Sequence, residues 1–127
     1  MPAIDDKVLD NIRALQMDGM PDLLSEMIDI YLTDTPLLFD ALRRALAQGD
    51  APVAHRAAHS LQSTSAHIGA TVLSALSKEI EKFGRDGDLA QVAARLPLLE
   101  SEYQAVQAAL KAIHAQMPRP SLGAAQR

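Results

Sequence analysis

The side chain best suited to do chemistry in this 127-residue chain is His59. If the residues around it form a helix, each advances about 100° around the axis, so Ala57 and Leu61 lie on one side and His59 on the other. An exposed imidazole has a free nitrogen lone pair near neutral pH and can act as a nucleophile. The pattern therefore predicts a reactive histidine on a docking surface. Its neighbours on the same side of the helix include small and uncharged residues: His55, Gln62, Ser63 and Ala66.

Metal binding is a second interpretation of the same helix, because His55 and His59 are spaced as in helical zinc sites. Such a motif also has a Glu beside the first His and a third ligand nearby. Arg56 occupies the Glu position, and His67 lies about 12 Å further along the axis. We therefore expect no metal site, and we expect His67 and His114 to be ordinary polar positions.

Two stretches before this helix have the periodicity of amphipathic helices. Asp5 is the expected cap of the first, and residues 19–21, which include a Gly and a Pro, should end it. The second starts after Asp22 and stays in phase across Pro36, where we expect a kink or a new helix capped by Thr35. The positions expected to be buried are Ile4, Val8, Ile12 and Leu15 in the first stretch, and Leu24, Ile28, Leu32, Thr35, Phe39, Leu42 and Leu46 in the second.

The helix that carries His59 should begin and end at recognisable signals. Gly49 and Asp50 supply a stop and a new cap, and Pro52 is tolerated in a first turn. Gly69 should turn the chain at the other end, since it adopts a positive φ without a Cβ clash. The expected buried stripe is Ala54, Ala57, Leu61, Thr64 and Ile68.

Two further helices follow. Residues 84–87 (Gly-Arg-Asp-Gly) should break the first of them, and Pro97 should kink or split the second. The second has a heptad-like stripe that would also suit an intermolecular coiled coil, although Pro97 and many Ala favour packing within the chain. The expected buried residues are Leu73, Leu76, Ile80 and Phe83, followed by Leu89, Val92, Leu96, Leu99, Tyr103, Val106, Leu110 and Ile113.

Helical stripes joined by short turns favour an all-α fold, an antiparallel four-helix bundle over about residues 21–115 with an additional short N-terminal helix covering one end or side. We expect residues 1–116 to form a single domain. Residues 117–127 are rich in Pro, Gly, Ala and polar residues without periodicity, and are expected to form a flexible tail.

Composition excludes several classes of function. A net charge of −4 argues against general nucleic-acid binding, and the absence of Cys excludes disulfides and thiolate chemistry. No apolar run is long enough to cross a membrane, and the amino terminus lacks the features of a secretory signal, so we expect a cytoplasmic protein. The chain has no Gly-rich phosphate loop, no acidic cluster at metal-binding spacing and no kinase signature, so no catalytic site of its own is expected.

Residues 59–63 read His-Ser-Leu-Gln-Ser, and Gly-Ala follows at 69–70 after five more residues. This motif resembles the phosphoacceptor helix of histidine-containing phosphotransfer (HPt) domains, which usually read His-x-Leu-Lys-Gly, five residues, Gly-Ala. The spacing agrees throughout. Gln62 and Ser63 replace the usual Lys and Gly, which removes a positive charge but keeps a small residue. The helices on either side also follow the family's order.

The resemblance implies a phosphorelay intermediate of a two-component system, a phosphoprotein that carries a phosphoryl group on His59 between receiver domains. The partners would be response-regulator receiver domains and a hybrid sensor histidine kinase, with Asp, Lys and Mg²⁺ on the receiver and no cofactor in this chain. The rival function is a helical adaptor that is not phosphorylated. A monomer is expected, and Met1 favours a stand-alone chain over a segment of a larger kinase. The expected site is His59, with a phosphate environment and docking face of His55, Gln62, Ser63 and Ala66, and with Gly69 as a structural turn. Gln62 and Ser63 are equally well explained as solvated polar positions.

Overall fold

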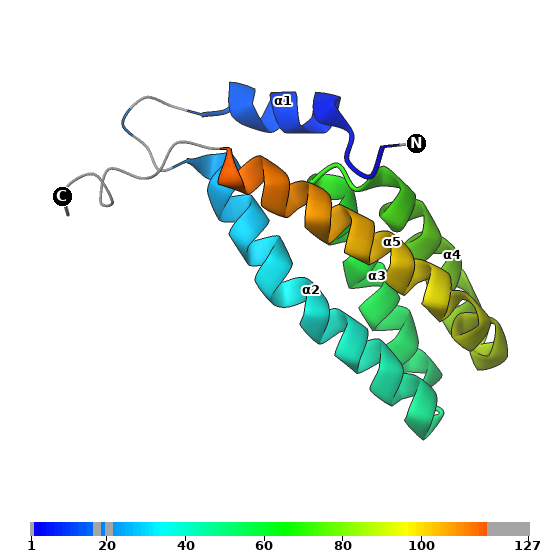
Figure 1. The fold of residues 1–127 in the computed structure, drawn as a ribbon. Helices are drawn as coiled ribbons and strands as arrows, with labels where there is room; N and C mark the ends of the chain where they lie inside the picture. The colour runs from blue at the N-terminus through cyan, green and yellow to red at the C-terminus, as the bar shows by residue number, and fades with distance from the viewer. Residues whose placement is uncertain (1, 17–18, 20–21, 117–127) are drawn as a thin grey trace.

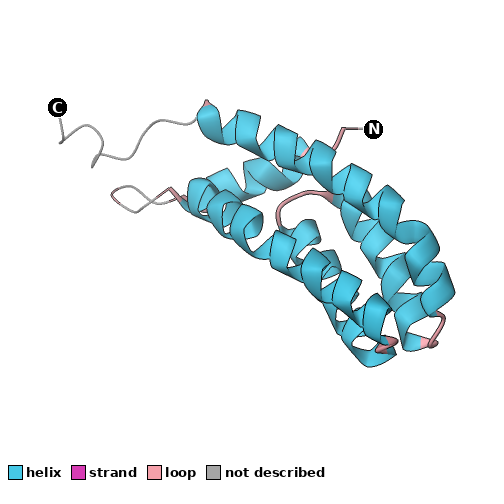
Figure 2. Ribbon diagram, turned by 60° about the horizontal axis from the view of Figure 1, so that its bottom comes forward, coloured by secondary structure: helices cyan, strands magenta, loops and turns pink. Residues whose placement is uncertain are grey.

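The computed structural model describes residues 2–16, 19 and 22–116. In this part of the chain all regular structure is helical, as the sequence predicts (Figure 2). The expected break at Pro21 and the expected tail of residues 117–127 lie outside the described residues. The helices are α1 (Asp6–Ala14), α2 (Leu23–Gln48), α3 (Ala51–His67), α4 (Thr71–Arg85) and α5 (Leu89–Ala115).

Helices α2 to α5 form an antiparallel bundle, and α1 lies across one end of it (Figure 1). The largest helix interface joins α3 to α4, and the next joins α2 to α3. A hydrogen bond from the Asp5 amide to the Gly69 carbonyl, 2.7 Å long, ties the start of α1 to the turn between α3 and α4. The predicted bundle with a short covering helix is therefore confirmed. No described helix has the length and apolar character needed to cross a membrane.

The helix boundaries follow the predicted capping residues. Asp5, Asp22 and Asp50 each precede a helix, and the carboxylate of each accepts a hydrogen bond from a first-turn amide. Gly49 ends α2 in the left-handed region with φ of 68°. These local signals determine where the chain turns, and so set the order in which helices meet.

Aliphatic side chains from every helix make one core, as the stripes predict. Leu32 and Leu46 are only partly buried, and Tyr31 and Ala45 occupy the buried positions next to them. The largest fully buried side chains are Leu9, Leu24, Ile28, Leu42, Leu61, Ile68, Leu73, Ile80, Leu99, Leu110, Val92 and Val106.

Two positions predicted to be buried are exposed. Leu15 is 69% exposed because α1 ends at Ala14, earlier than expected, and Leu15 lies just beyond it. Thr64 is exposed as well, while Ala58 and Ser65 are fully buried. The reason is that α3 has its largest interface with α4, so its buried face is rotated away from Thr64.

Neither proline divides its helix. Pro36 lies inside α2 and Pro97 inside α5, so of the two alternatives predicted at each proline, a kink or a division of the helix, the division does not occur. Both prolines are exposed, so the hydrogen bond that each removes lies on the solvent side. Packing of the buried face before and after each proline therefore maintains the helix.

Candidate functional site

His59 lies near the middle of α3 and points outward, with 61% of its side chain exposed. Ala57 and Leu61, its neighbours two positions away in either direction, are buried in the core. The structure therefore confirms that this helix turns His59 toward solvent and buries Ala57 and Leu61.

Glu81 of α4 holds the ring of His59. The Oε2 atom of Glu81 lies 3.0 Å from Nδ1 of His59, and only 17% of the glutamate side chain is exposed. An ionised carboxylate only accepts hydrogen bonds, so Nδ1 carries the proton and donates it. In the neutral imidazole Nε2 then keeps its lone pair, and it is the nitrogen able to attack an electrophile.

His55 is fixed by the same residue of α4. Its Nδ1 donates to the backbone carbonyl oxygen of Glu81 at 3.2 Å, and the side chain is half-buried. His55 and His59 are thus each directed at Glu81, one at its carbonyl and one at its carboxylate. Among the described residues no group of three or more His, Cys, Asp or Glu side chains is placed to hold a metal ion.

Gly84 explains why α4 approaches α3 so closely. A Cβ atom at this position would lie 3.0 Å from the backbone nitrogen of His55 and 3.1 Å from its Cα. Gly84 was expected to help break the helix, but it lies inside α4 and is buried. Its lack of a side chain allows the contact that brings Glu81 to His59.

Sequence reasoning missed Glu81 as a site residue. It is 22 positions from His59, and no local pattern joins them. One signal was available, a buried stripe of small residues along α4 that marks a face suited to close helix packing. The stripe is Ser74, Ser77 and Gly84.

The other predicted site residues lie along the same side of α3. Gln62, Ser63 and Ala66 are half-buried, and the Gln62 backbone carbonyl accepts a hydrogen bond of 2.9 Å from Ser74 Oγ of α4. Gly69 follows the helix with φ of 85°, as predicted, and a Cβ there would lie 3.0 Å from the Asp5 carbonyl oxygen. The structure therefore brings His55, His59 and Gln62 against α4.

A family model described as "Hpt domain" matches residues 26–109, which include α3, α4 and most of α2 and α5. This chain belongs to the Hpt domain family. Hpt domains are phosphotransfer carriers of two-component phosphorelays, where they work with receiver domains and hybrid kinases, and they are not enzymes of the classical kind.

Two solved structures are similar to this Hpt domain. Histidine-containing phosphotransfer protein B (HptB) from Pseudomonas aeruginosa PAO1 is 27% identical, with a TM-score of 0.83 over 92% of this chain and 98% of that one. The HPT domain of a sensor hybrid histidine kinase from Shewanella is 22% identical, with a TM-score of 0.76 over 92% and 97% of the two chains, and supports the fold alone. No curated protein sequence matches the chain significantly.

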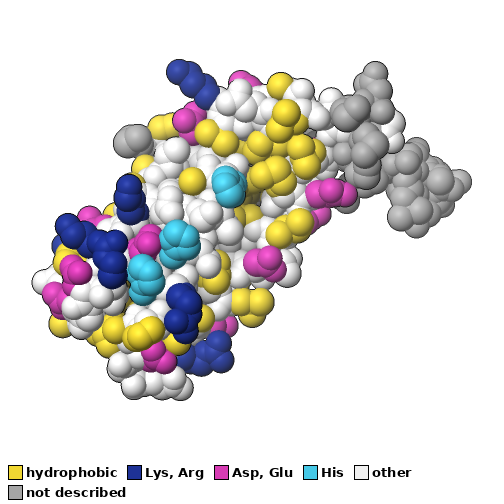
Figure 3. Space-filling model, turned by 180° about the vertical axis from the view of Figure 1, so that it is seen from behind, with side chains coloured by type: hydrophobic (Ala, Val, Ile, Leu, Met, Phe, Trp, Pro, Cys, Tyr) yellow, Lys and Arg dark blue, Asp and Glu magenta, His cyan; other side chains and the backbone are white. Residues whose placement is uncertain are grey.

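One face of this Hpt domain carries histidine side chains with Lys and Arg beside them (Figure 3). On α4 the basic residues Lys78, Lys82 and Arg85 line a hollow of about 340 Å³ together with Glu79 and Glu81. Glu81 belongs both to this hollow and to the contact with His59. Three basic and two acidic side chains of α4 therefore lie around this hollow, which meets the site at Glu81.

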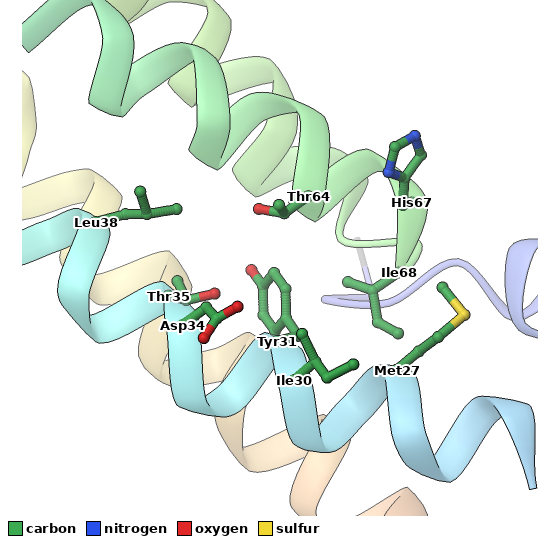
Figure 4. A pocket seen from close by; sticks show the side chains of 9 residues that line it. All are labelled: Met27, Ile30, Tyr31, Asp34, Thr35, Leu38, Thr64, His67 and Ile68. Atoms are coloured by element: carbon green, nitrogen blue, oxygen red, sulfur yellow. The ribbon is translucent and has the colours of Figure 1, made fainter.

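A second hollow, of about 180 Å³, lies between α2 and α3 and does not include His59. Figure 4 shows the ring of Tyr31 standing between the two helices, and its hydroxyl lies 2.9 Å from Ser65 Oγ. Burial raises the pKa of Tyr31 to about 12, so this phenol stays neutral and serves as a hydrogen-bonding group. The lining residues are Met27, Ile30, Tyr31, Asp34, Thr35, Leu38, Thr64, His67 and Ile68.

The two remaining histidines lie away from the His59–Glu81 contact. His67 is exposed at the end of α3. His114 of α5 joins α2, since its Nε2 lies 3.0 Å from Ser25 Oγ and 3.1 Å from a carboxylate oxygen of Asp29. His114 thus links the end of α5 to the start of α2.

Proposed function

We propose that this Hpt domain accepts a phosphoryl group on Nε2 of His59 from the aspartate of one receiver domain and passes it to the aspartate of another. The observation that carries the proposal is the contact between His59 Nδ1 and Glu81, which occupies Nδ1 and leaves Nε2 as the nitrogen available for attack on an exposed side chain. The family to which the chain belongs supports a phosphorelay role. We propose His59 as the phosphorylated residue and transfer from one receiver to another as its role.

The transfer step balances without an acid or base. The Nε2 lone pair forms a bond to phosphorus as the bond from phosphorus to the aspartyl oxygen breaks, and the carboxylate leaves with that electron pair. The imidazole keeps its Nδ1 proton and becomes cationic, which strengthens its hydrogen bond to the Glu81 carboxylate. Transfer to a second aspartate is the reverse reaction, so the same contact serves both steps.

In this proposal the receiver supplies the rest of the chemistry. Phosphoryl transfer needs positioning and charge neutralisation, usually with Mg²⁺, and we assign the metal, the aspartate and the catalytic Lys to the partner. His55, Gln62, Ser63 and Ala66 would form the docking face, and Gly69 the turn behind it. We further propose that the domain acts as a monomer in the cytoplasm, with a hybrid kinase upstream.

Incubation with a phosphorylated receiver tests the proposal. We expect phosphate on this protein that is labile in acid and stable in alkali, as phosphohistidine is. A chain that binds the receiver but acquires no such phosphate would instead be the adaptor that the missing Lys and Gly at positions 62 and 63 left open.

Glu81→Gln should lower the fraction of phosphorylated His59. The amide replaces a carboxylate that faces an imidazole made cationic by transfer, and a hydrogen bond to a charged group is worth about 1 kcal/mol or more, about fivefold in an equilibrium constant. The measurement is the phosphotransfer equilibrium with one receiver.

The matched control is Glu79→Gln, because Glu79 is on the same helix but pairs with Arg95 instead of His59. We expect its equilibrium constant to equal that of the parent. Equal constants for Glu81→Gln and the parent would show that the contact with His59 does not stabilise the phosphorylated form.

Ser63→Trp should slow transfer while leaving helicity near normal. Ser63 is one turn after His59 on the same side of α3 and does not belong to the core, so a bulky ring there would obstruct an approaching receiver. The measurement is the rate of label transfer, with circular dichroism alongside. Ser101→Trp, at an exposed position of α5, is the control. Transfer at the parental rate in Ser63→Trp would mean that the partner does not cross this turn.

A further inference from the structure

Position 62 is where this Hpt domain lacks a charge. The motif that it resembles has Lys there, whereas Gln62 offers only a neutral amide. A phosphoryl group on His59 would carry about two negative charges on a half-exposed surface, so a nearby cation would stabilise it. Since position 62 carries no cation, a positive charge near His59 has to come from another element of the fold.

Helix α4 has three cations next to the site. Lys78, Lys82 and Arg85 line the hollow that also contains Glu79 and Glu81. Within residues 2–16, 19 and 22–116, none of the three forms a side-chain hydrogen bond or ion pair, unlike Arg13, Arg43 and Arg95. Their charges are therefore free to meet a ligand.

The register between the two helices distinguishes Lys78 from the others. His59 contacts Glu81 through its carboxylate, and one turn further along α3 the Gln62 carbonyl accepts a hydrogen bond from Ser74. Ser74, Lys78 and Glu81 are spaced four and three apart, so they share one face of α4. Lys78 thus lies between the two contacts along α4, at the exposed edge of the face that meets α3.

The other two cations are less well placed. Lys82 follows Glu81 directly and so is turned about 100° away around the helix. Arg85 lies at the last turn of α4, next to Gly84, which packs on His55 rather than on Gln62. Of the three, Lys78 is therefore the cation on the Gln62 side of His59.

We propose that Lys78 supplies, from α4, the positive charge that position 62 lacks, and binds the phosphoryl oxygens of phosphorylated His59. The inference rests on the proposed function, since it presumes a phosphoryl group on His59. The ammonium group has three donors on a flexible four-carbon stem, which suits a point contact to a phosphoryl oxygen. Because it approaches from a second helix, it leaves the α3 surface around Ser63 unobstructed.

The test is the equilibrium constant for phosphoryl exchange between His59 and one receiver, measured at low and high salt. This constant does not depend on how tightly the two proteins dock, so it reports only the relative stability of the two phosphorylated forms. For Lys78→Gln we expect a two- to fivefold shift toward the phosphorylated receiver at low salt, the range for an exposed ion pair. The shift should shrink at high salt, because surface charges are screened.

Two further variants sharpen the test. Lys82→Gln, one turn after Lys78 on α4, removes the same charge and should leave the constant near the parental value. The double variant Lys78→Gln with Gln62→Lys moves the charge from α4 to α3, and we expect it to restore the parental constant. Circular dichroism verifies that each variant keeps its helices.

The outcomes separate the two hypotheses. If the parent is labelled on His59 and Lys78→Gln has the parental constant, the inference about Lys78 is wrong and the proposed function stands. A change in transfer rate with an unchanged constant also overturns it, because Lys78 would then act in docking. If the parent takes up no phosphate at all, the proposed function fails and the inference fails with it.

Discussion

A His59→Gln chain takes up no phosphoryl group from a phosphorylated receiver. The amide of glutamine has no nitrogen lone pair comparable to that of imidazole, so the nucleophile is lost. Folding is affected little, because 61% of the His59 side chain is exposed and surface substitutions usually change stability by about 0.5 kcal/mol or less. The measurements are labelling by the receiver and chemical denaturation of both proteins.

His67→Gln is the matched control, since it changes the other exposed histidine of α3 and keeps His59. We expect it to be labelled like the parent. Labelling that persists in His59→Gln would place the phosphoryl group on another residue and overturn the site assignment.

Gly84→Ala should destabilise the domain by about 1–3 kcal/mol, the usual cost of adding a methyl group to a tightly packed contact. The new Cβ would lie 3.0 Å from a backbone atom of His55, and backbone cannot rotate out of the way as a side chain can. The helices α3 and α4 would have to separate, which would also weaken the contact between Glu81 and His59. Denaturant unfolding measures the first effect, and the phosphotransfer equilibrium measures the second.

The predicted loss of stability has the opposite sign to the usual effect of this substitution in a helix. Gly→Ala inside a helix ordinarily stabilises it by up to about 1 kcal/mol, because Ala has the higher helix propensity. A Gly84→Ala protein that is as stable as the parent, or more stable, would show that α4 can move away from His55 at no cost. The close approach would then have no role in positioning Glu81.

Local features of the fold could be predicted from the sequence because their causes are local. The Asp5, Asp22 and Asp50 caps lie within a few residues of the amides that they bind, and the left-handed φ of Gly49 and Gly69 depends on the glycine itself. Periodicity within single helices then gives most of the core and the all-α bundle.

The sequence alone was a poor guide to the prolines and to the helix edges. A proline inside a helix removes one hydrogen bond, so the sequence left a kink and a break as alternatives at Pro36 and Pro97. In the bundle, buried faces on both sides of each proline continue to pack, and this nonlocal contribution exceeds the local cost. Thr64 likewise lies at the edge of its stripe, and only the rotation of α3 toward α4 decided that it is exposed.

For the candidate site, the sequence by itself determined that His59 lies opposite Ala57 and Leu61 on a helix, because a helical period of 3.6 residues requires it. The tertiary structure alone decided that Glu81 meets its Nδ1 and that Ser74 of α4 binds the backbone carbonyl of Gln62. Those placements depend on the rotation and register of α4 against α3. They arise from packing between helices, such as Gly84 against the backbone of His55, 29 positions earlier, which no periodicity within one helix encodes.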